Sequence, residues 1–258
     1  MIRELFVKQR PLMIAGSISF LCCVVLAVVS LIDSTEILGI NRWIKPMKFF
    51  VSIAIFLWTT AIYLYFLKGY NKSARFVSWA MIFIFFVEMF VIVLQSARGT
   101  TSHFNVKTPF DAGLYAVMGI TIALNTLIAA YLLYLYFRAE IELPESIVWG
   151  MRLGLILFLA SSFEGGYMSA QIGHAVGVKD GGTGLPIVNW STSGGDLRVA
   201  HFFGMHAFQA VPFFAYTLEK YNVKSSTVWT FVFAFVYFAI FTFVFVQALL
   251  GKPLFAGF

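Results

Sequence analysis

Two glutamates lie deep inside stretches of sequence that are otherwise apolar. Glu88 and Glu164 are near the middle of two such stretches, and a glutamine follows each seven residues later, at Gln95 and Gln171. An ionisable side chain inside a membrane-spanning helix costs about 2.5–3.5 kcal/mol on insertion scales, which makes it a candidate for function. A carboxylate in apolar surroundings can act as a general acid or carry a proton. We therefore predict that Glu88 and Glu164 are catalytic residues. The alternative for Glu88 is a structural role, in which it hydrogen-bonds a neighbouring helix as its neutral acid.

The histidines lie close to the same stretches. The chain has four of them, at or beyond the ends of the two stretches and in the next one: His103, His174, His201 and His206. Imidazole suits zinc, iron and copper, and histidines on facing helices can hold a haem. The pattern predicts that the histidines bind a metal ion (Zn, Fe or Cu) or a haem. Capping and packing are the alternative roles for each histidine taken singly.

Arginine, aspartate and amide side chains accompany the histidines. We predict that they bind a ligand, and the set comprises Gln95, Arg98, Asn105, Gln171, Asp196, Arg198 and Gln209. The arginines could neutralise haem propionates or capture an anionic solute. The alternatives are that Arg98 and Arg198 pair with Asp111 or Asp196, or that they contact lipid phosphate.

Long apolar helices must position these side chains. Of the 258 residues, 60% are hydrophobic and 12% are charged, and 30 are phenylalanine, which fits a surface that faces lipid. Runs of about 20 apolar residues predict membrane spans, and backbone groups in hydrocarbon require them to be helical. The fold class is therefore all-α, a polytopic membrane protein with a seven-transmembrane-helix bundle. We predict one domain over 1–258 with spans at about 11–32, 49–67, 76–97, 113–137, 147–173, 199–218 and 226–249.

Chain direction brings the polar residues to one face of the membrane. The spans at 76–97 and 147–173 run toward the same side, and the span at 199–218 begins there. Each glutamate and its glutamine form a stripe along one side of a helix, because seven residues complete about two turns. We expect these three spans to contact one another and His174 to close the second of them. Their shared polar chamber is the predicted site.

Basic residues set the predicted orientation. If the N-terminus is cytoplasmic, ten of the 18 basic residues lie inside: Arg3, Lys8, Arg10, Lys68, Lys72, Arg75, Arg138, Arg152, Lys220 and Lys224. This small excess favours an N-terminus inside and a site facing outside, in a plasma membrane or a bacterial inner membrane. The charge of +6 is dispersed in short clusters at span ends, which indicates contact with membrane lipids and not with nucleic acid.

Two classes of function fit the sequence. The first is a membrane-embedded metalloprotein, a metal- or haem-dependent oxidoreductase or hydrolase that acts on a small or lipidic substrate. The second is a transporter or ligand-binding sensor that uses the same polar cavity for a proton, an ion or an anion. The last span contains no lysine that could carry retinal. The sequence leaves the oligomeric state open.

Overall fold

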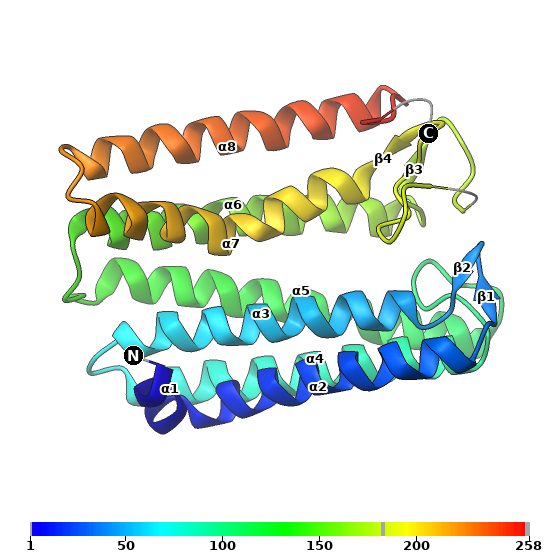
Figure 1. Ribbon diagram of the computed structural model, residues 1–258, viewed down its shortest axis with the longest axis horizontal. Helices are drawn as coiled ribbons and strands as arrows, with labels where there is room; N and C mark the ends of the chain where they lie inside the picture. Colours follow the sequence, from blue (N-terminus) through cyan, green and yellow to red (C-terminus); the bar gives the residue numbers. More distant parts are fainter. Residues whose placement is uncertain (1, 182–183, 256–258) are drawn as a thin grey trace. The chain divides into compact units, whose positions relative to one another are not determined.

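The described residues form eight helices and two short β-hairpins. The structure is a computed structural model that describes residues 2–181 and 184–255, and Figure 1 labels its elements. A short helix, α1, precedes seven long ones. The helices are α1 (Ile2–Lys8), α2 (Arg10–Ile32), α3 (Ile44–Phe66), α4 (Asn71–Ala97), α5 (Pro109–Arg138), α6 (Glu145–Ala170), α7 (Leu197–Lys220) and α8 (Ser226–Leu249).

The seven long helices coincide with the seven predicted apolar stretches to within a few residues at each end. Six of them are long and apolar enough to cross a membrane, and α7 is the exception. The chain is therefore a helical, multi-pass membrane protein, as predicted. The composition of α7 explains its lower hydropathy, since it carries an arginine and two histidines in its first half and ends on Glu219 and Lys220.

The helices belong to two compact units, Met1–Ile128 and Ala129–Phe258. The first unit contains α1 to α4 and most of α5, and the second contains the end of α5 and α6 to α8. The expectation that 1–258 is a single domain stays a prediction.

In the first unit, α2 contacts α3 and α4, and α3 contacts α4. The link between α2 and α3 is an antiparallel hairpin of β1 (Glu36–Ile37) and β2 (Ile40–Asn41). Its turn residues Leu38 and Gly39 both have positive φ, as a type I′ turn requires. Below the hairpin, Arg42 forms an ion pair of 2.5 Å with Asp33, which also accepts a hydrogen bond from the Trp43 indole at 2.7 Å.

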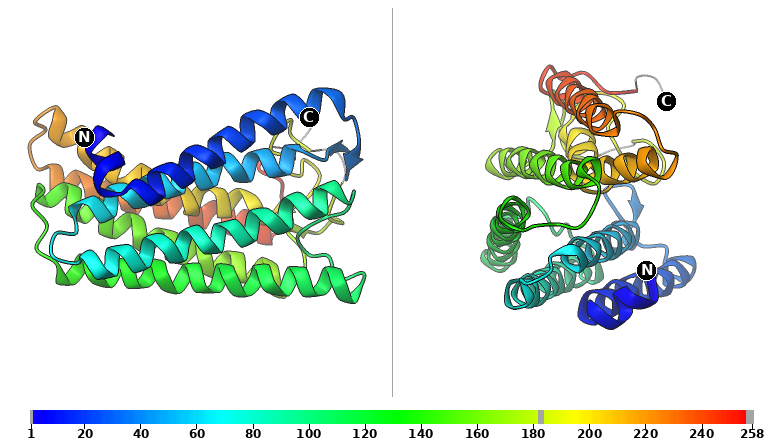
Figure 2. Two further views of the ribbon diagram at one scale, coloured as in Figure 1. Left: turned by 90° about the horizontal axis from the view of Figure 1, so that it is seen from below. Right: turned by 90° about the vertical axis from the view of Figure 1, so that its left-hand side faces the viewer.

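In the second unit, α6, α7 and α8 all contact one another, and the right-hand view of Figure 2 shows them nearly end-on. Glycines allow α6 and α7 to approach closely. A Cβ on Gly150 would lie 2.8 Å from Cβ of Ala215, and a Cβ on Gly204 would collide with Ser161. Small residues at such contacts are typical of packed membrane helices. Between α6 and α7 lies a second antiparallel hairpin, of β3 (Ala175–Val176) and β4 (Gly195–Asp196).

The two units repeat one order of elements. In each, a helix leads through a two-stranded hairpin to a second and a third helix, and all three helices contact one another. The repeat pairs α2 with α6, α3 with α7 and α4 with α8, while α5 connects the two sets. In this order of elements, Glu88 lies on the third helix of the first set and Glu164 on the first helix of the second set.

Candidate functional site

A carboxylate–imidazole pair joins α6 to α7. Nδ1 of His201 lies 2.9 Å from Oε2 of Glu164 and 3.2 Å from the carbonyl oxygen of Ser161. The Ser161 hydroxyl in turn donates to the His201 carbonyl oxygen at 3.1 Å. Gly165 makes room for the ring, because a Cβ there would lie 2.7 Å from Cε1 of His201. Two helices thus hold one imidazole against one buried carboxylate.

The second oxygen of this carboxylate is also buried. Glu164 is 5% exposed, and the structure gives its Oε1 no hydrogen-bond partner within the described residues. Gln209, further along α7, likewise has a buried Oε1 without a donor in the described part of the chain. A buried acceptor without a donor is costly. These two oxygens are therefore positions at which a proton, a water or a ligand donor would be stabilised.

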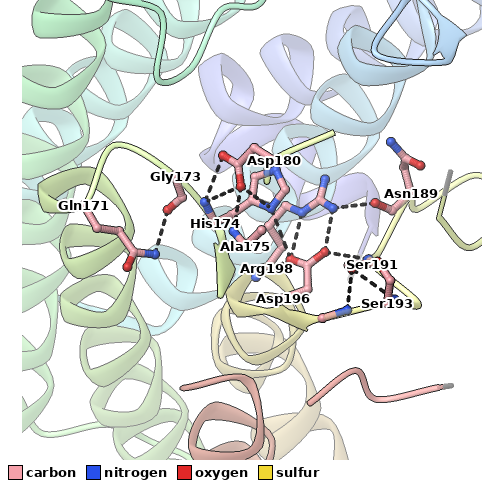
Figure 3. A network of polar contacts seen from close by, with 11 residues as sticks. Gln171, Gly173, His174, Ala175, Asp180, Asn189, Ser191, Ser193, Asp196 and Arg198 are labelled. Atoms are coloured by element: carbon pink, nitrogen blue, oxygen red, sulfur yellow. Dashed lines mark hydrogen bonds and ion pairs between the residues drawn. The ribbon is translucent and has the colours of Figure 1, made fainter. Parts of the chain in front are cut away.

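The start of α7 is held by an aspartate–arginine pair (Figure 3). Asp196 is the N-cap of α7, and its carboxylate accepts hydrogen bonds from the Arg198 backbone N–H at 3.0 Å, from Arg198 Nε at 2.9 Å and from the Ser191 backbone N–H at 2.9 Å. Arg198 Nη2 lies 2.6 Å from Asp196 Oδ2 and also donates to the Asn189 carbonyl oxygen. This network ties the end of the long connection to the helix.

Asp196 remains ionised although it is only 3% exposed. Burial acts to raise its pKa, but the proximity of His174, the hydrogen bonds from Arg198 and the positive charge of Arg198 outweigh burial and hold the pKa well below its usual range. Asp196 therefore stabilises the folded state as a carboxylate.

His174 lies between two aspartates in the same network (Figure 3). Its Nδ1 is 3.5 Å from Asp196 Oδ1 and 3.6 Å from Asp180 Oδ1, and its backbone carbonyl accepts from Leu197. The prediction that His174 closes the helix at 147–173 is wrong, because α6 ends at Ala170. A turn and the β3–β4 hairpin follow the helix end and carry His174 back toward the start of α7.

Gln171 is separated from Glu164 by this early helix end. It is the exposed C-cap of α6, and its amide donates to the Gly173 carbonyl oxygen at 2.9 Å. The predicted one-sided stripe is therefore present in α4 but not in α6.

In the first unit, α4 and the first half of α5 form polar contacts. The Thr121 hydroxyl lies 2.6 Å from Oε1 of Glu88. Two turns further along α4, Gln95 donates to Asp111 at 2.9 Å, and Arg98 pairs with the same carboxylate at 2.7 Å. The expected pairing of both arginines is thus observed, with Arg98 beside Asp111 and Arg198 beside Asp196, while ligand binding by either arginine stays a prediction.

The remaining predicted residues of this unit lie in the loop after α4. Asn105 donates to the Thr101 carbonyl at 2.9 Å and to the Thr100 hydroxyl at 3.1 Å, which fixes the loop. Nδ1 of His103 is 3.2 Å from Nζ of Lys45 and 3.1 Å from the Ser102 hydroxyl.

The four histidines have four different surroundings. His206 contacts a residue of its own helix. Its Nδ1 lies 2.7 Å from the Phe202 carbonyl oxygen, and the centroids of the imidazole and the Phe202 ring are 4.1 Å apart. His103 belongs to the first unit, while His174 and His201 contact different carboxylates in the second. Within residues 2–181 and 184–255, no three His, Cys, Asp or Glu side chains are grouped so that they could hold a metal ion.

Of the three spans expected to share a chamber, α6 and α7 contact each other, and α4 belongs to the first unit. The structure also identifies polar partners that were not predicted: Ser161 and Thr121 inside helices, and Asp180 in the connection between β3 and β4. A serine or threonine inside an apolar stretch gives a weak sequence signal, because membrane helices tolerate these residues with the hydroxyl bonded to the backbone of their own helix.

Comparisons with protein-family models, with curated proteins and with solved structures found no match for this chain.

Proposed function

We propose that this chain is a seven-span membrane protein of the transporter class that translocates protons, with Glu164 and His201 as the proton-loading pair. The observation that carries the proposal is the contact of 2.9 Å between His201 Nδ1 and Glu164 Oε2, beside a second carboxylate oxygen that is buried without a donor. Imidazole and carboxylate are the side-chain pair best suited to exchange a proton near neutral pH.

The two members of the pair differ in their access to the surroundings. The side chain of His201 is 33% exposed, whereas that of Glu164 is 3% exposed. A proton taken up by the imidazole can pass through Nδ1 to the carboxylate. This transfer neutralises the imidazolium and the carboxylate together, and the reverse transfer charges both again. The proton thereby moves from an accessible group to a buried one without leaving a hydrogen bond.

The repeated order of elements supports the transporter class. Many transporters are built from two structural repeats, and in some of them the repeats are parallel. Here helix, hairpin, helix and helix occur twice, with α5 between them. Seven spans follow if α7 crosses as well. Its 24 residues would extend about 36 Å, enough for a hydrocarbon core of about 30 Å.

The predicted orientation is part of the proposal, with the N-terminus in the cytoplasm and the pair near the outer face of a plasma or bacterial inner membrane. In this orientation three arginines lie on the outer side. Each of them, Arg42, Arg98 and Arg198, forms an ion pair with an aspartate. The basic residues on the cytoplasmic side then dominate contact with anionic lipid, which supports this orientation.

The test is a proton-flux measurement on the full chain in liposomes that contain a pH-sensitive dye. A potassium gradient with valinomycin drives proton entry, and we expect flux several-fold above that of protein-free liposomes. Glu164→Gln and His201→Ala should reduce it to the protein-free level. Glu140→Gln is the matched control, since it makes the same change at an exposed loop position. Equal flux in wild type and protein-free liposomes would overturn the proposal.

A metal ion or a haem at His201 is the second candidate function, with redox or hydrolytic chemistry on a small or lipidic substrate. One observation favours it: a metal-binding histidine commonly directs its other ring nitrogen to a carboxylate, as Nδ1 of His201 does toward Glu164. Nε2 would then be the ligand. The visible spectrum and metal content of the purified protein test this candidate, and a Soret band or stoichiometric metal that His201→Ala removes would favour it over proton translocation.

A further inference from the structure

Thr121 on α5 has more acceptors around it than one hydroxyl can serve. Its Oγ1 lies 2.6 Å from Glu88 Oε1, 3.0 Å from the Val117 carbonyl oxygen and 3.0 Å from the Met118 carbonyl oxygen. A hydroxyl has one proton to donate and two lone pairs with which to accept. An ionised Glu88 would therefore compete with two backbone carbonyls for a single proton.

A proton on Glu88 removes this competition. The acid can then donate to Thr121 Oγ1, and Thr121 can donate to a carbonyl of its own helix. The distance of 2.6 Å lies within the usual range for such an O–H···O bond. The Thr121 hydroxyl then donates once and accepts once, and no charge is buried.

Burial at this position also favours the neutral acid. Glu88 is 2% exposed, and it forms no ion pair within the described residues. Lys45, near the start of α3, is a cation of the same unit. The Lys45 ammonium, however, contacts His103 Nδ1 at 3.2 Å at the end of its helix. An ionised carboxylate without a contacting cation inside a membrane helix is costly.

A second buried acceptor continues the site along α5. Asn125 lies one helical turn from Thr121, is 3% exposed, and has an Oδ1 without a hydrogen-bond partner in the described part of the chain. Residues four apart lie on the same face of a helix. Thr121 and Asn125 therefore form a short polar stripe, and Asn125 offers the next acceptor for a proton or a water.

We propose that Glu88 is a second proton-binding site, in the first unit, where it is held as a neutral acid that donates to Thr121. The inference extends the proposed function from one proton site to two, one in each unit. When the proton binds or leaves, the only covalent bond that forms or breaks is the O–H bond of the Glu88 carboxyl group.

Infrared spectroscopy of the full chain in lipid nanodiscs tests the proposal directly. At pH 7 an exposed glutamate is ionised, so the C=O stretching band of a neutral carboxylic acid reports a buried acid. We expect such a band, shifted by exchange into D2O, to disappear in Glu88→Gln. It should shift to higher frequency in Thr121→Val, which removes the hydrogen bond, and stay in place in Thr121→Ser, which keeps the hydroxyl.

The result also separates this inference from the proposed function. If no acid band at pH 7 is lost in Glu88→Gln, Glu88 is ionised and the inference is overturned, whatever the proton flux. If the Glu88 band is found but wild-type liposomes show no flux, the inference stands and the proposed function fails. Glu164→Gln serves as the second control, because it should leave the Glu88 band unchanged.

Discussion

Glu164 and Glu88 each lie within hydrogen-bonding distance of one polar side chain, and the two partners differ in what they can do with a proton. His201 has two ring nitrogens and can accept or donate, so a proton can move through it. Thr121 has one hydroxyl that is already close to two backbone carbonyls. The first arrangement favours exchange of a proton, and the second favours its retention.

Stability measurements should detect the Glu164–His201 contact as a coupling between the two side chains. We expect the effects of Glu164→Ala and His201→Ala on the free energy of unfolding to be non-additive, with a coupling of about 1–2 kcal/mol. Either substitution alone already removes the hydrogen bond between the two side chains, so the double variant does not lose it a second time. Chemical unfolding in detergent of both single variants and the double variant gives this value. The pair Glu164→Ala and His206→Ala is the control, and it should be additive within about 0.5 kcal/mol. A coupling near zero for Glu164 and His201 would contradict the contact.

The depressed pKa of Asp196 predicts a pH-dependent contribution to stability. The folded-state pKa lies below the unfolded value of about 3.9, so the stabilisation is fully present above about pH 5 and is lost as the pH falls through the folded pKa. Wild type should therefore melt at a higher temperature than Asp196→Asn at pH 6, and the difference should shrink below pH 4. Melting temperatures across this range check the prediction, and a difference that grows in acid would contradict it.

At the scale of elements, the hydropathy of the chain predicted the helices well but not all of their ends. A helix in lipid must satisfy its backbone internally, so each apolar run becomes one helix. The ends depend on local contacts. The segment before Phe49 was not predicted to be helical, yet α3 begins at Ile44, while α6 ends at Ala170, before Gln171 and His174. The shift at α6 decides which predicted residues can reach α7.

Adjacent glycines in α6 provide a matched test of helix packing. A Cβ on Gly165 would lie 2.7 Å from His201, whereas a Cβ on Gly166 would have no neighbour within 4 Å. Gly165→Ala should lower the melting temperature and proton flux by displacing His201. Gly166→Ala should leave both unchanged or raise stability, because alanine favours the helix by up to about 1 kcal/mol over glycine. Equal behaviour of the two variants would contradict the close approach of α6 and α7.

At the scale of the whole molecule, the two units share one order of elements. In this order α6 takes the place of α2, and α8 takes the place of α4. The correspondence depends on which helices contact each other and on where the hairpins lie. Neither property is encoded in a local pattern of residues.

Cysteine accessibility should establish whether α7 crosses the membrane. On a Cys22→Ala, Cys23→Ala background, we expect Ser193→Cys to react with an impermeant maleimide added to intact cells. Lys224→Cys, beyond the other end of α7, should react only after permeabilisation. Both positions are exposed in the structure. Reaction of both from the same side would show that α7 does not cross, and reaction of Lys224→Cys alone would show that the orientation is reversed.

The sequence by itself determined that this is a multi-pass helical membrane protein, and it located the seven long helices and the polar residues within them. Long apolar runs suffice for this, because lipid permits few other structures. Only the tertiary structure decided which polar residues meet. Contacts such as Glu164 with His201 and Glu88 with Thr121 join different helices, and they depend on where each helix ends and which neighbour it packs against. Four histidines that were predicted to lie toward one face of the membrane therefore have four separate environments.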